Sequence, residues 1–410
     1  MNEYRTVTAC VRHRIHTNFW SDEVGKHLLV NGLSITGGGG FTVGLELSRN
    51  IAAARPDWTV TLAFSDGHHF KPELEAAEVP PNLDVQYAPS ETLSIRPRLA
   101  YERGPLSEFV NHGGDVDGVL QLNAQVVPTF RKPSLAHYQD PMPYRSIARP
   151  SGLRNAIRPF LKRRALGASL KRAAVCGWTS EYLRDLITSF HGYSPKKSVV
   201  FYNGIPQDWI DAVDRGLPDW ESRPMELLSL SNVAGYKRQS LVIQSLPGLI
   251  DRPETVDIVY RIVGACPDEQ RASLTALAES LGVGERVIIE GRVSVERVQE
   301  VLRTSRAFTL MSLCESFGIP AIEAMRYGTP PVVSDCCAHP EVCRDAALLV
   351  PIDDIQALTD SLHAALSDRE TADRLRQAGV ENIKRFSWVS IAERMVGELE
   401  QMMDAGLPAG

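Results

Sequence analysis

The chain has 410 residues, of which 43% are hydrophobic, and its formal net charge is -6. This length allows two or three domains of ordinary size, and the acidic balance argues against a nucleic-acid partner, which would need a basic surface. No apolar run reaches the roughly 18 residues that span a bilayer, and residues 1–16 lack the hydrophobic segment of a signal peptide. We therefore expect a cytoplasmic protein.

The first domain is predicted to cover residues 26–205. Residues 1–25 show no regular period and are interpreted as an N-terminal extension. After them, apolar strand-like segments recur at 27–35, 58–64, 117–123, 134–139, 172–180 and 198–204. Helical patterns separate most of these segments, and this alternation is typical of a parallel α/β sheet.

A second domain is predicted for residues 206–385. It begins with a Pro-, Asp- and Trp-rich stretch, 206–224, whose weak periodicity suggests an interdomain connection. Strand-like segments follow at 225–231, 256–264, 286–291, 307–312, 330–335 and 346–351. The fold class is therefore α/β, with two Rossmann-like, doubly wound domains facing each other across a cleft. In such sheets ligands bind at the carboxyl ends of the strands.

The cysteines do not form a recognisable metal or disulfide framework. The seven cysteines include no Cys-x-x-Cys pair, which indicates free thiols in a reducing compartment. A zinc site is the alternative for one cluster: Cys336, Cys337, His339 and Cys343. Adjacent cysteines in so short a loop suit tetrahedral zinc poorly, so we favour a packed loop there.

The most informative stretch for function is SLCESFGIPAIEAMRYGTPPVVSD, residues 312–335. Pro320 suits the first position of a helix and Gly328 suits the position after its end, so we predict a short helix from about Pro320 to Tyr327. The free amides ahead of such a helix, together with the positive end of its dipole, make an anion site that suits a phosphate.

Two glutamates flank this anion site. Glu315 precedes it, Glu323 lies one turn inside the predicted helix, and the two enclose seven residues. This spacing, embedded in FG-x-P-x-x-E-A-M-x-x-G-T-P-x-V, resembles the family-4 retaining glycosyltransferases of GT-B architecture. The similarity covers the C-terminal domain, including FSW at 386–388, and is looser in the N-terminal half. A capped core helix with two solvated glutamates is the alternative.

The resemblance implies a role for each residue of the motif. Glu315 would contact the sugar hydroxyls, Glu323 would bind the donor ribose, and the amides of Phe317, Gly318 and Ile319 would lie near the β-phosphate. The chemistry agrees with this assignment, because carboxylates accept hydrogen bonds from hydroxyls whereas phosphates need donors.

The same family clamps the pyrophosphate with an arginine and a lysine after the first strand of the second domain. Lys237 fits the lysine, whereas the arginine position falls on Ser231 or Asn232. Either Arg238 replaces the missing charge or the donor is bound differently. A cation is needed because the leaving nucleoside diphosphate gains negative charge as the glycosidic bond breaks. A solvated surface lysine is the alternative for Lys237.

Two features of the first domain also resemble the family. The glycine-rich segment 36–40 matches the turn after the first strand, where amides of Gly38 and Gly39 would approach the ligand. A flexible turn without a ligand is the alternative. His137 ends a predicted strand where the family carries a histidine close to the transferred sugar, so we expect it to hydrogen-bond to the sugar. A buried structural histidine is the alternative.

Residues 145–172 form a basic run with nine Lys or Arg side chains, and no Asp or Glu occurs between Asp140 and Glu181. A helix here would carry an apolar face, interrupted by Pro159, that contains Leu153, Ile157, Phe160 and Leu161. Such a basic amphipathic surface would suit anionic lipid and a lipid-linked acceptor. A solvated helix and a phosphate-facing wall of the cleft are the alternatives.

We therefore predict a retaining hexosyltransferase. The first domain would hold a glycan, lipid-linked or small-molecule acceptor, and the second a nucleotide-diphosphate sugar. The resemblance implies that a last helix, within 386–410, crosses back onto the first domain, and that no cofactor or metal ion is required. A phosphorylase or sugar-nucleotide epimerase on the same fold, and a catalytically silent nucleotide-binding protein, are the alternatives. Fold resemblance does not define donor or acceptor.

Overall fold

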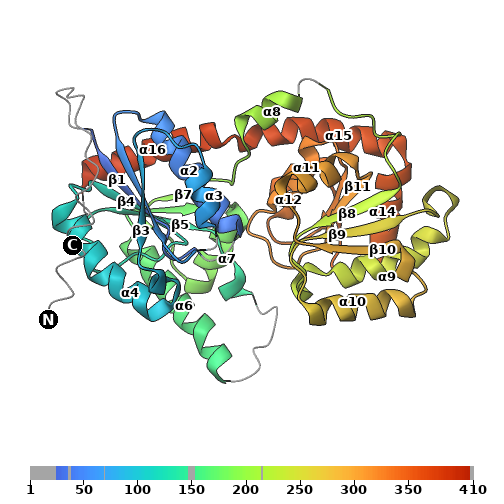
Figure 1. Cartoon of the computed structure of the whole chain (residues 1–410), viewed down its shortest axis with the longest axis horizontal. Coiled ribbons are helices and arrows are strands. Elements are labelled where there is room, and N and C mark those ends of the chain that lie inside the picture. The colour runs from blue at the N-terminus through green and yellow to red at the C-terminus, as the bar shows by residue number, and fades with distance from the viewer. Residues whose placement is uncertain (1–24, 36–37, 69, 146–152, 214–215, 407–410) are drawn as a thin grey trace.

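The computed structural model describes residues 25–35, 38–68, 70–145, 153–213 and 216–406. It contains two separate parallel sheets with helices packed around each of them (Figure 1). We call the parts built on these sheets the N-terminal unit (β1–β7) and the C-terminal unit (β8–β13). The predicted fold class, two Rossmann-like α/β units, is confirmed.

The sheet of the N-terminal unit has the strand order β3-β2-β1-β4-β5-β6-β7, and every neighbouring pair is parallel. Its strands are β1 (His27–Asn31), β2 (Thr59–Ser65), β3 (Leu83–Ala88), β4 (Gly118–Leu122), β5 (Ser134–Tyr138), β6 (Val175–Trp178) and β7 (Ser198–Val200). Its helices are α2 (Gly38–Ala54), α3 (Lys71–Ala76), α4 (Ile95–Arg103), α5 (Pro105–Glu108), α6 (Leu153–Arg172) and α7 (Glu181–His191). The central strands are buried along their whole length, as expected for a parallel sheet covered on both faces.

The sheet of the C-terminal unit has the strand order β10-β9-β8-β11-β12-β13 and is also parallel. Its strands are β8 (Glu226–Leu230), β9 (Val259–Val263), β10 (Val287–Gly291), β11 (Ala307–Leu310), β12 (Pro331–Ser334) and β13 (Leu348–Val350). Its helices are α9 (Gln239–Ile250), α10 (Asp268–Ser280), α11 (Val295–Thr304), α12 (Ile319–Arg326), α13 (His339–Cys343), α14 (Ile355–Ser367) and α15 (Arg369–Ile383). All six strands predicted for this half of the sequence are present.

The last helix, α16 (Trp388–Ala405), returns to the N-terminal unit and lies beside α2 (Figure 1). Its buried side chains, among them Trp388 and Leu399, join the core that contains β1 and β2. The chain crosses where Ile205 and Ser387 form a parallel bridge. A Cβ at Gly204 would lie 2.5 Å from the Trp388 ring, so the crossing requires glycine at that position.

Three local features differ from the expectation or add detail to it. Gly38 and Gly39 lie at the start of α2, and residues 36–37 of the glycine-rich segment are outside the described residues. Pro159 does not interrupt α6, which is continuous from Leu153 to Arg172. The stretch interpreted as a connection contains a helix, α8 (Gln207–Val213). The expected N-terminal extension lies outside the described residues except for Gly25.

No helix in the described ranges is long and apolar enough to cross a bilayer.

Candidate active site

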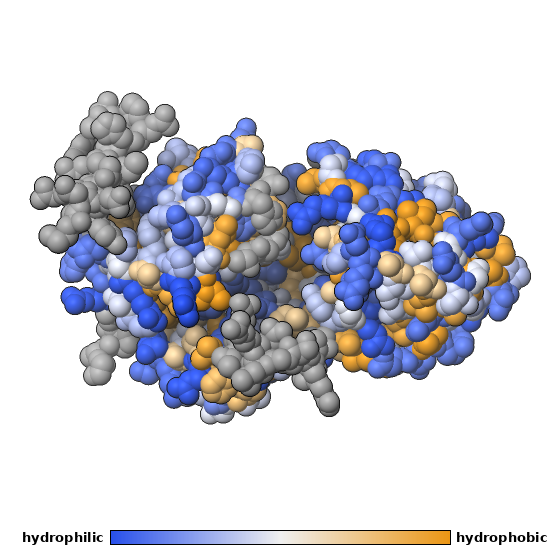
Figure 2. Space-filling model, turned by 60° about the horizontal axis from the view of Figure 1, so that its bottom comes forward, coloured by the Kyte–Doolittle hydropathy of each residue, from blue (hydrophilic) through white to orange (hydrophobic). Residues whose placement is uncertain are grey.

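The candidate site lies at the point where the strand order of the C-terminal sheet reverses. From β8 the chain continues through β9 to β10 on one side of the sheet, and it then returns to place β11 on the other side of β8. The loops after β8 and β11 therefore open at the same edge, which is where doubly wound sheets bind ligands. Lys237 ends the short helix η4 (Gly235–Lys237) after β8, and Glu315 follows β11. Figure 2 shows a hollow between the two units.

Lys237 and Glu315 form an ion pair inside this site. The Lys237 ammonium lies 2.5 Å from a Glu315 carboxylate oxygen, and each side chain is 14% exposed. The two loops are also joined through the backbone, because the Leu313 amide donates to the Tyr236 carbonyl at 2.8 Å. The structure thus brings together the predicted phosphate ligand and the predicted sugar ligand, which are far apart in sequence.

The anion site predicted ahead of α12 is built around Gly318. This residue caps the helix with a φ of +95°, in the left-handed region that favours glycine. A Cβ there would lie 3.1 Å from the buried ring of His339, so any other residue would have to push this ring back slightly. The His339 Nδ1 is bonded to Ser334, and its Nε2 has no partner among the described residues. His339 therefore forms the wall behind Gly318.

The amides next to Gly318 are available to a ligand. Within the described residues, the N–H groups of Phe317, Gly318 and Ile319 donate to no carbonyl or side chain. The Phe317 side chain points into the core instead, edge-on to Phe386 at a centroid distance of 5.1 Å. The backbone of this segment, together with the dipole of α12, can accept a phosphate.

Glu323, on the second turn of α12, has an unusual acidity. Burial of its carboxyl raises its pKa to about 7, and the nearby Arg326 opposes this shift. The Arg326 guanidinium stacks over Trp209 of α8 at 4.2 Å from the ring centroid. Glu323 is thus a carboxylate that is partly protonated at neutral pH.

This pKa predicts a pH-dependent stability difference between the wild type and Glu323→Gln. A raised carboxyl pKa means that the folded state binds the proton more tightly, so stability is lost as pH rises from about 4.5 through 7. We expect similar free energies of unfolding at pH 5, where Glu323 is neutral like glutamine. At pH 8 the variant should be more stable relative to the wild type by roughly 1–3 kcal/mol. Urea unfolding of both proteins at pH 5 and pH 8 measures these free energies. If the difference between the two proteins were the same at both pH values, the raised pKa of Glu323 would be contradicted.

Arg238 occupies a different setting from Lys237. Its guanidinium pairs with Asp353, whose side chain is 62% exposed, and its φ of +58° places it at the N-cap of α9. At the position of the missing arginine, Asn232 accepts from the Ala265 amide and Ser231 accepts from Gln239. Lys237 is therefore the one of the two neighbouring cations that contacts Glu315.

The N-terminal unit places one cation, Arg145, next to the candidate site. From the sequence, Arg145 was identified only as part of the basic run 145–172. Arg145 donates to the Leu313 carbonyl at 3.0 Å, two residues before Glu315. On α13, the Glu341 carboxylate accepts from the amides of Glu181 and Tyr182 at the start of α7. These contacts between units depend on the tertiary fold, and no local signal in the sequence identifies them.

His137 lies at the end of β5 but inside the core. It is 1% exposed, its ring is edge-on to Phe201, and its Nδ1 lies 3.2 Å from the Gln139 side-chain nitrogen. Burial lowers its pKa to about 4, so the imidazole is neutral at physiological pH. Direct contact with a sugar requires a rearrangement of the residues that bury it. Gly39 is exposed at the start of α2, with open space around it.

The cysteine cluster is not arranged as a metal centre. The six cysteines in the described part of the chain are free, and no group of three or more His, Cys, Asp or Glu side chains there is placed to hold a metal ion. The Cys336 and Cys337 thiols instead donate to the carbonyls of Ser312 and Leu313. These contacts pack the loop against the strand end that leads to Glu315.

Two solved structures share this architecture over nearly the whole chain. Sucrose-phosphate synthase from Thermosynechococcus elongatus superposes with a TM-score of 0.73 and 19% identity, covering 93% of this chain and 100% of that one. HepE from Anabaena, in complex with UDP and glucose, gives a TM-score of 0.69 and 17% identity, covering 92% and 100%. The fold is therefore the GT-B architecture.

The sequence similarity to known families lies in the C-terminal half. Residues 214–382, less than half of the chain, match the family model of the glycosyl transferases group 1. Phosphatidyl-myo-inositol mannosyltransferase of Mycobacterium leprae is 31% identical over 173 residues, which are 42% of this chain and 44% of that protein. D-inositol 3-phosphate glycosyltransferase of Nocardia farcinica is 35% identical over 126 residues, 30% of this chain and 28% of that protein. The chain thus matches less than half the length of either relative.

Proposed function

We propose that the protein is a retaining glycosyltransferase that moves a hexosyl group from a nucleoside-diphosphate sugar to a hydroxyl of a glycan, lipid-linked or small-molecule acceptor. The observation that carries this proposal is the Lys237–Glu315 pair, which lies at the strand-order reversal directly before the free amides of α12. This arrangement offers a phosphate its hydrogen-bond donors and offers sugar hydroxyls a carboxylate acceptor, within one site. The relatives named above support sugar transfer, and the UDP in the HepE crystal supports a nucleotide donor.

In the proposed complex each group meets the part of the donor that its chemistry suits. The pyrophosphate lies against Lys237 and the amides of Phe317, Gly318 and Ile319, with Glu323 at the ribose. Glu315 accepts from the sugar hydroxyls. When phosphate displaces Glu315 as the partner of Lys237, the carboxylate becomes available to the sugar, so donor binding itself prepares this contact.

The reaction that we propose breaks the bond between the anomeric carbon and the β-phosphate oxygen. The acceptor oxygen forms the new bond on the same face of the sugar, and its proton passes to the departing phosphate oxygen. Lys237 and the dipole of α12 stabilise the negative charge that develops on the diphosphate. This assignment requires no metal ion, and metal independence stays a prediction.

A ligand panel tests the proposal even before the substrate has been identified. UDP, GDP, ADP and TDP, each with its glucose and mannose conjugate where one exists, are compared by thermal unfolding. A ligand at 100 times its Kd should stabilise the fold by about 2.7 kcal/mol. We expect one base to stand out and its sugar conjugate to be hydrolysed slowly. Stabilisation by none of them would overturn the proposal, and formation of sugar 1-phosphate with inorganic phosphate would favour a phosphorylase.

A further inference from the structure

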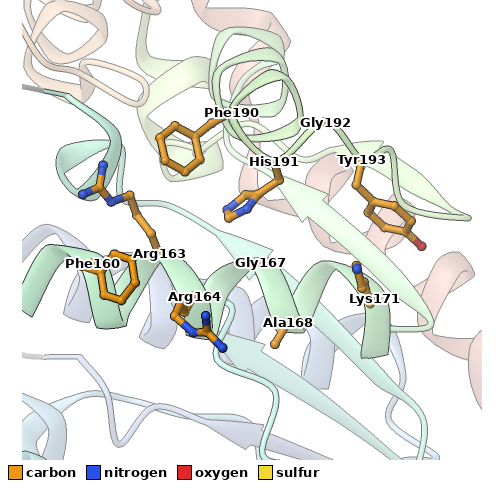
Figure 3. Close-up of a pocket in the computed structure, with 10 residues that line it drawn as sticks. All are labelled: Phe160, Arg163, Arg164, Gly167, Ala168, Lys171, Phe190, His191, Gly192 and Tyr193. Carbon is orange, nitrogen blue, oxygen red and sulfur yellow. The ribbon is translucent and has the colours of Figure 1, made fainter.

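A second basic pocket lies on the N-terminal unit, between α6 and the end of α7 (Figure 3). It has a volume of about 660 Å³. Three cations of α6 line it, Arg163, Arg164 and Lys171, and the chain segment that closes α7 lines the opposite side with Phe190, His191 and Tyr193. None of these residues belongs to the Lys237–Glu315 site.

The charge in this pocket is not neutralised by the protein. No Asp or Glu lines it, and α6 contains none. Within the described residues, Arg163, Arg164 and Lys171 form no ion pair with a carboxylate, whereas the neighbouring Lys162 pairs with Asp140. Unpaired cations that line one cavity attract an anion, because their fields add there.

Aromatic rings hold the cations in place. The Arg163 guanidinium lies over Phe190 at 5.2 Å from its centroid, and the Lys171 ammonium over Tyr193 at 5.7 Å. Figure 3 shows His191 reaching from α7 toward Gly167, where a Cβ would lie 2.5 Å from the imidazole. Burial and the charges of Arg163 and Lys171 lower the pKa of His191, as a region of positive potential should.

The mouth of the pocket is apolar. Phe160 is 53% exposed and Phe190 is 51% exposed, and Leu161 beside them is exposed as well. Orange atoms stand beside blue ones on the lower face of the N-terminal unit that is turned forward in Figure 2. A ligand that only carried charge would leave these rings in water, so the pocket suits a charged group joined to an apolar one.

We propose that this pocket binds the phosphate group of a ligand that also carries an apolar portion. Arg163 and Lys171 donate to the phosphate oxygens, for which a guanidinium has matching geometry. Phe160 and Phe190 cover the apolar portion. The pocket is also linked to the space between the units, because His191 bonds to the Tyr144 hydroxyl at 2.9 Å and the next residue, Arg145, contacts Leu313.

The test compares two variants that lose the same charge. Arg163→Gln/Lys171→Gln removes two cations from the pocket, and Arg96→Gln/Arg303→Gln removes two exposed cations elsewhere, on α4 and α11. The probes are phenyl phosphate by calorimetry, and phosphatidylcholine vesicles with or without phosphatidic acid by co-sedimentation. Circular dichroism verifies that both variants are folded. We expect at least a tenfold loss of binding to one or both probes in the pocket variant only.

The probes distinguish the sources of the phosphate. A loss with phenyl phosphate identifies a soluble ligand, and a loss confined to phosphatidic acid vesicles identifies a lipid headgroup and the membrane contact predicted for 145–172. Phe190→Ala should weaken phenyl phosphate and spare inorganic phosphate if the ring covers the apolar portion. Absence of binding to both probes, or equal losses in the two charge variants, would overturn the proposal. The pocket variants should not change donor binding at Lys237. The proposed function therefore stands even if this pocket binds no phosphate.

Discussion

Glu315→Ala is expected to lower single-turnover sugar transfer by at least about a hundredfold, the usual scale for a group that acts in the transition state. Nucleoside-diphosphate affinity should stay within a few-fold of the wild type or increase. The structure gives the reason for this direction: Glu315 forms an ion pair with Lys237, so its removal leaves the ammonium free for phosphate. Single-turnover transfer and calorimetric nucleotide binding measure the two effects separately.

Glu290→Ala is the matched control for this experiment. Glu290 is also a half-buried glutamate in ion pairs, with Arg261 and Arg297, but it lies on β10 away from the candidate site. We expect it to change stability and leave transfer nearly unaffected. Equal losses of turnover in the two variants would mean that Glu315 matters only for the fold.

Lys237→Ala is expected to weaken nucleoside-diphosphate binding by about 1.5–3 kcal/mol, the contribution of a hydrogen bond to a charged group. Binding of the bare nucleoside should hardly change, because only the diphosphate contacts the ammonium. Glu315 would then stand unpaired beside the phosphate, so the double variant Lys237→Ala/Glu315→Ala should bind the diphosphate better than Lys237→Ala alone. Calorimetry with nucleoside and diphosphate tests both statements.

Arg238→Ala tests which cation replaces the arginine that the family usually carries. Its guanidinium is engaged by an exposed Asp353, and exposed ion pairs contribute little, so we expect a smaller loss of diphosphate affinity than for Lys237→Ala. A larger loss would assign the phosphate contact to Arg238.

For Lys237→Ala itself, equal losses of affinity for the nucleoside and for the nucleoside diphosphate would show that Lys237 does not contact the phosphates.

The sequence predicted most of the sheets because buried parallel strands are continuous apolar runs. β3 was missed because it lacks such a run: it is an edge strand in which Asp84 and Gln86 interrupt the apolar pattern. Gly38 and Gly39 were expected in a turn because glycine is typical of turns, whereas the structure places them at the start of α2. Pro159 likewise did not end α6, although proline usually disfavours a helix interior.

The candidate site was predictable only where its signal is local. The spacing of Glu315 and Glu323 and the start of α12 follow from a short motif, and the helix begins one residue before the predicted position. The Lys237–Glu315 pair, the His339 ring behind Gly318 and the Arg145 contact join distant segments, so spacing alone could not reveal them. His137 had the expected strand-end position, but its burial depends on Phe201, which is far away in sequence.

The stereochemistry of transfer tests the central claim most directly. Once the ligand panel has identified a donor, proton NMR of the first product formed reports the configuration at the transferred anomeric carbon. We predict that the new bond has the same anomeric configuration as the donor, and that transfer is lost in Glu315→Ala. An inverted product, or unchanged transfer in that variant, would contradict the account.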